Sequence, residues 1–390
     1  MTDNAQAGDA PSHTNDGFFS PVKIKAMAIV RRLSAPLATS DHAWQRLDFL
    51  RLVAACGILV HHSYEFAIPA SVRSAAMHRT EGLALFVDLF FAISGFTIAS
   101  MYAGRMASLT DYMRFLSRRA SRLLPLHWLT FLVSALFWIF VVKSGISSDH
   151  IPQLDASCTL RTVFLLHGVF ACQAVNGVSW SISAEMIFYI LFPAIALMAR
   201  PAARVLTAIL ALAAVIVTAF IFKSVADWTA LPPVIRGIPS FTLGVIMFNA
   251  RPAIEKLIVA DSAFYAAAIL MIFTMISPSP PWLTVCLCYI TVVAAICGDI
   301  HNKSTPLLRK LAPGAVLTYS IYMWHTLFII LVPNAIGDKI LHLEPLPMSF
   351  LLLLTYALIF FASLISYIYW EEPLRRIINE TYDRKLREKL

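Results

Sequence analysis

Ten apolar segments, each 16 to 23 residues long, follow one another along most of the chain. They lie near residues 50–67, 83–103, 123–142, 179–199, 204–222, 234–249, 262–277, 282–298, 315–333 and 348–370. A helix needs about 20 mostly apolar residues to cross a bilayer. With 58% hydrophobic and 14% charged residues, the chain has more apolar surface than a soluble domain of 390 residues can bury. The sequence therefore predicts an all-α, polytopic membrane protein with about ten transmembrane helices.

The Lys and Arg residues predict how these helices are oriented. If the N-terminus is inside, 24 of the 31 Lys and Arg residues lie on the inner side. Inner loops of membrane proteins carry such an excess, so both termini are predicted to be cytoplasmic. The net charge of +8 is distributed in short clusters between apolar runs, as topology signals are, and indicates no nucleic-acid partner.

Three regions follow from this pattern. Residues 1–42 are polar, with a basic apolar patch too short to span a bilayer, and are expected to form a flexible cytoplasmic tail. Residues 43–376 form one membrane domain, and residues 377–390 form a basic cytoplasmic tail. Pro373 is expected to end the tenth helix, because proline cannot continue the hydrogen-bond ladder.

The six cysteines show no metal-ligand spacing, so no metal site is expected. Cys286 and Cys288 lie in an apolar run, where cysteine acts as a small hydrophobic residue. Cys158 and Cys172 share the outer loop 143–178. Two interpretations of this pair stay open, a disulfide in an oxidising periplasm or two unpaired thiols.

The first apolar segment carries two ionisable side chains eleven residues apart, Arg51 and His62. In a helix this spacing is about three turns and roughly 16 Å, so both side chains project from nearly the same face. His61 points about 100° away from His62. Ionisable residues within a span face a bundle interior, a cavity or a partner, so this face is predicted to border a buried site.

Two further segments add polar groups. Asp88 lies near the outer entrance of the second segment, and the following Ser94-Gly95 pair is expected to allow close helix contact. The inner loop after this segment contains Arg114, Arg118, Arg119 and Arg122.

If the third helix starts early, Arg118 and Arg122 lie at i and i+4. Positive-inside topology alone would produce such a cluster, and so would a clamp for a phosphorylated ligand.

The fourth segment begins with Ser181, Glu185 and Tyr189, which step by four residues and line one helix face. A glutamate this deep in a span is expected to be functional, with a structural pairing to arginine or tyrosine as the alternative. A second intramembrane histidine, His325, lies in the ninth segment.

The order and spacing of these groups resemble the acyltransferase-3 family of bacterial membrane acyltransferases. The matching motifs are Leu47-Asp48-x-x-Arg51 with His62, Asp88-x-Phe90-Phe91-x-x-Ser94-Gly95-Phe96, Arg118-Arg119-x-x-Arg122-x-x-Pro125, Ser179-Trp180-Ser181-x-x-x-Glu185-x-x-Phe188-Tyr189, Tyr319-Ser320-x-Tyr322-x-x-His325 and Glu372-x-Leu374. The last motif departs from the family pattern, in which a proline follows the glutamate after a few residues.

The resemblance implies an O-acyltransferase of the bacterial inner membrane. It would take an acyl group, usually acetyl, from cytoplasmic acyl-CoA and pass it to a hydroxyl of an extracytoplasmic or lipid-linked glycan. Acyl-CoA is then a substrate, and no permanently bound cofactor is expected. The oligomeric state and the identities of the acyl group and the acceptor stay open.

The resemblance and the chemistry of acyl transfer together assign roles to residues. Transfer to an alcohol needs a base or a nucleophile that holds the acyl group, and His62 is the expected residue for either task. The other expected roles are catalytic for Glu185 and Asp88, donor binding for Arg51, Arg118, Arg119 and Arg122, and substrate binding for Ser181, Tyr189, Glu65 and His325.

A transporter or flippase for a lipid-linked sugar or small metabolite is the main alternative. Ten spans with buried charges fit a carrier as well, although the two halves of the sequence show no inverted-repeat symmetry. A receptor or scaffold with inert buried charges is a third class, and it predicts that His62 and Glu185 tolerate substitution.

Overall fold

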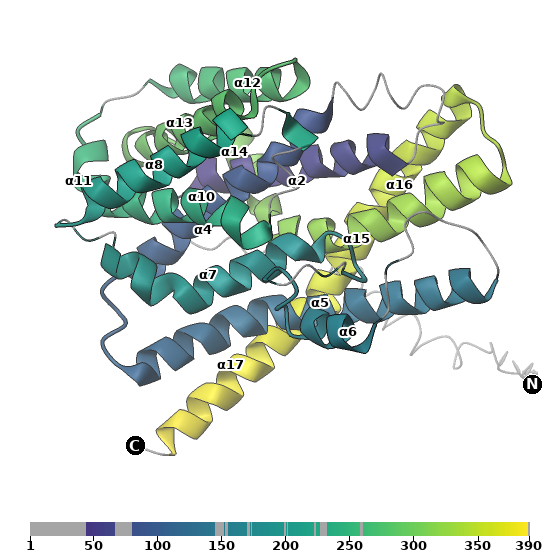
Figure 1. The fold of residues 1–390 in the computed structure, drawn as a ribbon, viewed down its shortest axis with the longest axis horizontal. Helices are drawn as coiled ribbons and strands as arrows, with labels where there is room; N and C mark the ends of the chain where they lie inside the picture. The colour runs from purple at the N-terminus through teal and green to yellow at the C-terminus, as the bar shows by residue number, and fades with distance from the viewer. Residues whose placement is uncertain are drawn as a thin grey trace, which may run out of the picture. The chain divides into compact units, whose positions relative to one another are not determined.

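The computed structural model describes residues 44–66, 80–144, 152, 155–169, 172, 174–198, 200, 202–221, 224–226, 232–257 and 260–388. Every regular element in these ranges is helical (Figure 1), which confirms the all-α prediction for them. The long helices are α2 (Gln45–Phe66), α4 (Phe86–Tyr102), α5 (Leu109–Lys143), α7 (Ser179–Met198), α8 (Arg204–Ile221), α10 (Pro233–Asn249), α12 (Asp261–Ile276), α13 (Pro281–His301), α15 (Thr318–Ile329), α16 (Pro345–Ser366) and α17 (Glu372–Arg387). The shorter elements are η1 (Glu81–Leu85), α6 (Ala156–Val163), α11 (Arg251–Ile254), α14 (Pro306–Leu311), η2 (Ala312–Leu317), η3 (Ile330–Ile340) and η4 (Tyr367–Glu371).

Each of the ten apolar segments coincides with one of the long helices. Among the residues that the structure describes, six helical stretches are long and apolar enough to cross a bilayer, which supports a multi-pass membrane protein. They are Glu81–Tyr102, Leu109–Lys143, Ser179–Met198, Pro281–His301, Pro306–Ile340 and Pro345–Arg387. The count of about ten spans and the cytoplasmic location of both termini stay predictions. The expected N-terminal tail, residues 1–42, lies outside the described residues.

Helix α4 is enclosed by α10, α2, α13 and α7. Its contact with α10 is close because glycines face backbone on both sides. A Cβ at Gly95 would lie 2.0 Å from the carbonyl oxygen of Phe241, and a Cβ at Gly244 would lie 2.1 Å from that of Ala92. The structure thus confirms that Gly95 serves close helix packing, as in other membrane bundles.

Helix α5 starts earlier than the third apolar segment. Ser108 and Asp111 form a capping box that begins the helix at Leu109, and the helix then runs 35 residues through Pro125. The arginine cluster is therefore part of a helix, with Arg118 and Arg122 one turn apart.

The prediction that Pro373 ends the tenth helix is wrong. Helix α16 continues through the π-helical turn η4 into α17, and Pro373 occupies the first turn of α17. A proline is tolerated there because it follows the π-helical turn directly, where the regular α-helical hydrogen-bond ladder is already interrupted. The region expected to be a basic tail is accordingly helical as far as Arg387.

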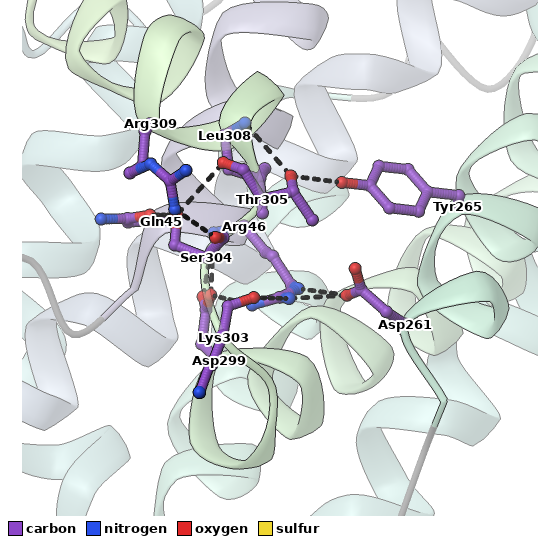
Figure 2. Close-up of polar contacts among 10 residues, drawn as sticks. All are labelled: Gln45, Arg46, Asp261, Tyr265, Asp299, Lys303, Ser304, Thr305, Leu308 and Arg309. Carbon is purple, nitrogen blue, oxygen red and sulfur yellow. Dashed lines mark hydrogen bonds and ion pairs between the residues drawn. The ribbon is translucent and has the colours of Figure 1, made fainter.

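The first residues of α2 are held by a buried ionic cluster, shown in Figure 2. The Arg46 side chain, 1% exposed, lies between Asp261 of α12 and Asp299 of α13, with N–O distances of 2.6 and 3.1 Å. The backbone N–H of Arg46 also donates to Asp299 at 3.0 Å. A buried charge is tolerated when it is paired in this way, so the cluster ties three helices together.

Candidate active site

A cavity of about 790 Å³, its open mouth included, lies among α2, α4, α5, α7 and α15. Six residues singled out by the sequence line it, namely Arg51, Arg119, Arg122, Ser181, Glu185 and Tyr189. They come from three helices that are far apart in the sequence. We call this space the arginine cavity.

The three arginines differ in how many of their guanidinium N–H groups already donate hydrogen bonds within the protein. Arg51 pairs with Asp48 at 2.6 Å and donates to the hydroxyl of Thr97. Arg119 donates to Tyr102 Oη at 3.2 Å and lies over the same ring. Arg122 donates no hydrogen bond to any described residue, although it lines the cavity. Its guanidinium is thus free to bind an anionic ligand.

Arg118, the fourth predicted donor-binding arginine, does not line the cavity. Its side chain is 45% exposed and contacts Asp383 of α17 at 3.3 Å, and Arg114 contacts the same carboxylate at 3.5 Å. Helix α17 lies along the first half of α5 (Figure 1). The structure therefore divides the arginine cluster between the cavity and the α5–α17 contact.

Glu185 is the carboxylate of the arginine cavity. Its Oε1 accepts hydrogen bonds from Ser94 Oγ at 2.5 Å and from the hydroxyl of Tyr189 one turn along α7. Its Oε2 accepts none from the described residues. The structural alternative, pairing with a tyrosine, is therefore realised at one oxygen, and the other is available to a substrate hydroxyl or a proton.

The two predicted histidines lie next to each other. The ring centroids of His62 on α2 and His325 on α15 are 5.1 Å apart, and His61 lies 4.9 Å from His62. His325 Nδ1 lies 2.7 Å from the carbonyl oxygen of Tyr322, so Nδ1 carries the proton and Nε2 is the basic atom. That Nε2 is buried and has no hydrogen-bond partner in the part of the chain that the structure describes.

The histidine pair adjoins the arginine cavity through Tyr322. Tyr322 lines the cavity, accepts a hydrogen bond from Ser181 at 2.7 Å, and its ring centroid lies 5.5 Å from that of His325. Neither His62 nor His325 lines the cavity itself. The side chain of Glu65 lies outside the described residues.

Asp88 is used in a buried ion pair outside the cavity wall. Arg236 of α10 donates to its Oδ2 from Nη2 at 2.6 Å and from Nε at 3.2 Å, and both side chains are at most 1% exposed. Arg236 also bonds to the carbonyl oxygen of Ala84 and lies over the ring of Trp180. These contacts indicate that Asp88 joins α4 to α10.

Sequence reasoning missed two buried polar groups near the site. Arg236 is the single charged residue near the start of the sixth apolar segment, and a lone charge within a span could have indicated a buried ion pair. Glu371, 3% exposed, accepts a hydrogen bond from Ser320 Oγ at 2.8 Å. It was overlooked because it lies at the end of a segment, where a carboxylate is ordinarily exposed.

The segment 155–169 is held to α5 and α7 by histidine contacts. His127 Nε2 lies 2.7 Å from the carbonyl oxygen of Thr162, and His167 Nε2 lies 3.3 Å from Ser179 Oγ. Burial, with a smaller contribution from His127, lowers the pKa of His167 to about 4. Cys158 and Cys172 form no disulfide in the structure, and burial, with a smaller contribution from the neighbouring Cys172, raises the pKa of Cys158 to about 11.

Comparison with known proteins gives one family. The acyltransferase-3 family, described as an acyltransferase domain, matches residues 44–369. Membrane-bound transacylase BcsY of Komagataeibacter xylinus is 30% identical over 258 residues, 61% of this chain and 64% of that protein. Acyltransferase MdmB of Streptomyces mycarofaciens is 27% identical over 312 residues, 73% of this chain and 78% of that protein.

The chain spans less than two thirds of the first of these relatives. No solved structure matches it significantly. The family match includes every residue that lines the arginine cavity and both histidines beside it. The chain belongs to the acyltransferase-3 family, whose members transfer acyl groups.

Proposed function

We propose that the protein transfers an acyl group, most simply acetyl, from cytoplasmic acyl-CoA to a hydroxyl of an extracytoplasmic or lipid-linked glycan in the bacterial inner membrane. The observation that carries the proposal is the arginine cavity, in which cationic and hydrogen-bonding side chains line one space beside a histidine pair. The family of the chain supports acyl transfer, and its multi-pass helices support a membrane location.

The arginines fit the donor. Coenzyme A carries a pyrophosphate and a phosphate group, and guanidinium groups bind phosphates through paired charge-assisted hydrogen bonds. Arg122 donates no hydrogen bond to the residues that the structure describes, while Arg51 and Arg119 are fixed by neighbouring side chains that set their direction. Acyl-CoA would bind with its phosphates toward these three residues and its thioester toward Glu185 and Tyr322.

The reaction needs one base. In the direct route, His62 removes the proton of the acceptor hydroxyl as its oxygen attacks the thioester carbonyl carbon. A C–O bond forms, the C–S bond breaks, and the proton passes to the departing sulfur, which leaves as free CoA thiol. In a two-step route the imidazole nitrogen of His62 attacks the thioester carbon and the C–S bond breaks to release CoA thiolate. The acceptor oxygen then attacks the acyl carbon, the C–N bond to the imidazole breaks, and the hydroxyl proton passes to the CoA thiolate. His325, whose ring faces that of His62, would position the His62 imidazole.

Mass spectrometry of surface glycans tests the proposal. Cells with the wild-type protein should carry an acyl ester that cells without it lack, and His62→Ala should remove the ester. His301→Ala is the matched control, because His301 is exposed, contacts the carbonyl oxygen of Glu255 and lines neither of the two cavities found among the described residues.

Identical glycans in all four strains would overturn the proposal. If the protein instead moved a sugar across the membrane without forming an ester, the carrier alternative would be correct.

A further inference from the structure

A second cavity, of about 600 Å³, lies outside the site described above. It is bordered by the second half of α5, by the segment 174–177 and by the end of α15. We call it the aromatic cavity after Phe137 and Trp138, which line it.

Along both α5 and α15, a residue that lines the arginine cavity is followed by one that lines the aromatic cavity. On α15, Tyr322 lines the arginine cavity and Thr326, one turn later, lines the aromatic cavity. Four residues rise about 6 Å along the helix axis, and residues four apart share a face. On α5, Leu123 lines the first cavity and Ser134 the second.

The histidine pair, His62 and His325, lies next to the part of α15 that borders both cavities. His325 stands on α15 between Tyr322 and Thr326, and the ring of His62 faces it. The Nε2 of His325 has no hydrogen-bond partner among the described residues. A base placed there is within one helical turn of both spaces.

The lining of the aromatic cavity fits a sugar ring. Small-molecule pockets combine aromatic walls with a few polar groups that fix orientation. Phe137 and Trp138 provide the aromatic wall, with Trp138 fixed by a 3.2 Å bond to the carbonyl oxygen of Val175. Asn176 and Thr326 provide polar atoms, and the hydroxyl of Thr326 is buried without a hydrogen-bond partner among the described residues. A buried hydroxyl left unpaired is costly, so a ligand hydroxyl bound to it would be favourable.

We propose that the aromatic cavity is the acceptor site and that it binds the hydroxyl-bearing sugar ring, while the arginine cavity holds the donor. This inference rests on the proposed function. It assigns each substrate its own chamber, and it places the transferred proton at the histidine pair between them.

Two substitutions in the full-length protein test the assignment. Thr326→Val removes the unpaired hydroxyl at nearly constant volume and should lower the acyl ester on the cell's glycans about three- to tenfold, the effect of one lost hydrogen bond. Ser134→Leu fills the cavity and should lower the ester more than about tenfold. The matched control is Thr355→Val, because Thr355 is equally buried and its hydroxyl bonds only to Leu351 of its own helix.

Donor binding is measured separately on the purified protein in lipid nanodiscs, with CoA as the probe. CoA should raise the unfolding temperature equally for wild type, Thr326→Val and Ser134→Leu, since binding stabilises the folded state by mass action. Separating organic-soluble glycolipids from aqueous polysaccharides before mass spectrometry shows which of the two carries the ester.

The outcomes distinguish failure of the acceptor site from failure of the proposed function. Wild-type ester levels in both aromatic-cavity variants would overturn the acceptor site alone, and so would loss of CoA stabilisation in both. Identical glycans from wild-type and His62→Ala cells would overturn the proposed function together with this site.

Discussion

At the scale of single residues, Arg118 and Arg122 show how one helical turn separates two roles. Both belong to the same sequence motif, yet Arg122 lines the arginine cavity while Arg118 contacts Asp383 near the surface. The periodicity of the sequence predicted that they share a helix. It did not predict which of them faces a ligand, because that depends on where α17 packs.

Arg122→Gln should therefore raise the KM for acyl-CoA about 10- to 100-fold, since a charge-assisted hydrogen bond is worth about 1.5–3 kcal/mol. Arg118→Gln is the control and should change KM less than about threefold, because exposed ion pairs contribute little. Steady-state kinetics on the purified protein measures both. Equal effects of the two substitutions would contradict the assignment.

The ion pair of Asp88 with Arg236 leads to a prediction about stability. Asp88→Asn should lower the free energy of unfolding by about 3–5 kcal/mol, because it leaves a buried guanidinium without its counter-charge. The double variant Asp88→Leu/Arg236→Met should recover most of this loss. Thermal unfolding in detergent measures it. Acyl transfer that survives in the double variant would show that Asp88 holds helices together, whereas complete loss would show a catalytic role.

At the scale of elements, the approach of α4 to α10 depends on glycine. Gly95→Ala should lower the free energy of unfolding by about 1–3 kcal/mol or more, because the new methyl group would overlap the carbonyl oxygen of Phe241. Gly177→Ala is the control, since a Cβ there meets nothing within 4 Å. A thermal unfolding scan in which both variants match wild type would show that the two helices separate without cost.

The buried His167 predicts that the packing of the segment 155–169 is sensitive to acid. Its pKa is lowered from 6.5 to about 4, so between these pH values the unfolded chain binds a proton that the folded chain does not. The free energy of unfolding should then fall by about 1.4 kcal/mol per pH unit as the pH drops from 6.5 toward 4. Above pH 6.5 the group has no effect. His167→Gln should remove this component of the pH dependence of unfolding, and an unchanged dependence would contradict it.

At the scale of the whole molecule, both termini are predicted to be cytoplasmic. Green fluorescent protein fused after Leu390 should fluoresce, because it folds only in the cytoplasm. Alkaline phosphatase inserted after residue 150 should be active, because it needs an oxidising compartment. The reverse pattern would invert the orientation and with it the direction of acyl transfer.

Hydropathy predicted where the helices lie, because each span must bury its own backbone hydrogen bonds. The sequence also indicated six of the residues that line the arginine cavity, because ionisable groups within spans are rarely lipid-facing. The partner of Asp88 could not be predicted, since Arg236 is 148 positions away. Nor could the aromatic cavity, whose lining residues are ordinary apolar and hydroxyl side chains with no sequence motif.

The ionic cluster around Arg46 has a consequence for the arginine cavity. Arg51 follows Arg46 by five residues on the same helix, so clamping the first turn of α2 between α12 and α13 also fixes where Arg51 points. Asp261 and Asp299 line neither the arginine cavity nor the aromatic cavity, yet they fix the helix that carries Arg51. Under the proposed function, breaking this cluster would weaken the binding of acyl-CoA without altering the residues that carry out the transfer.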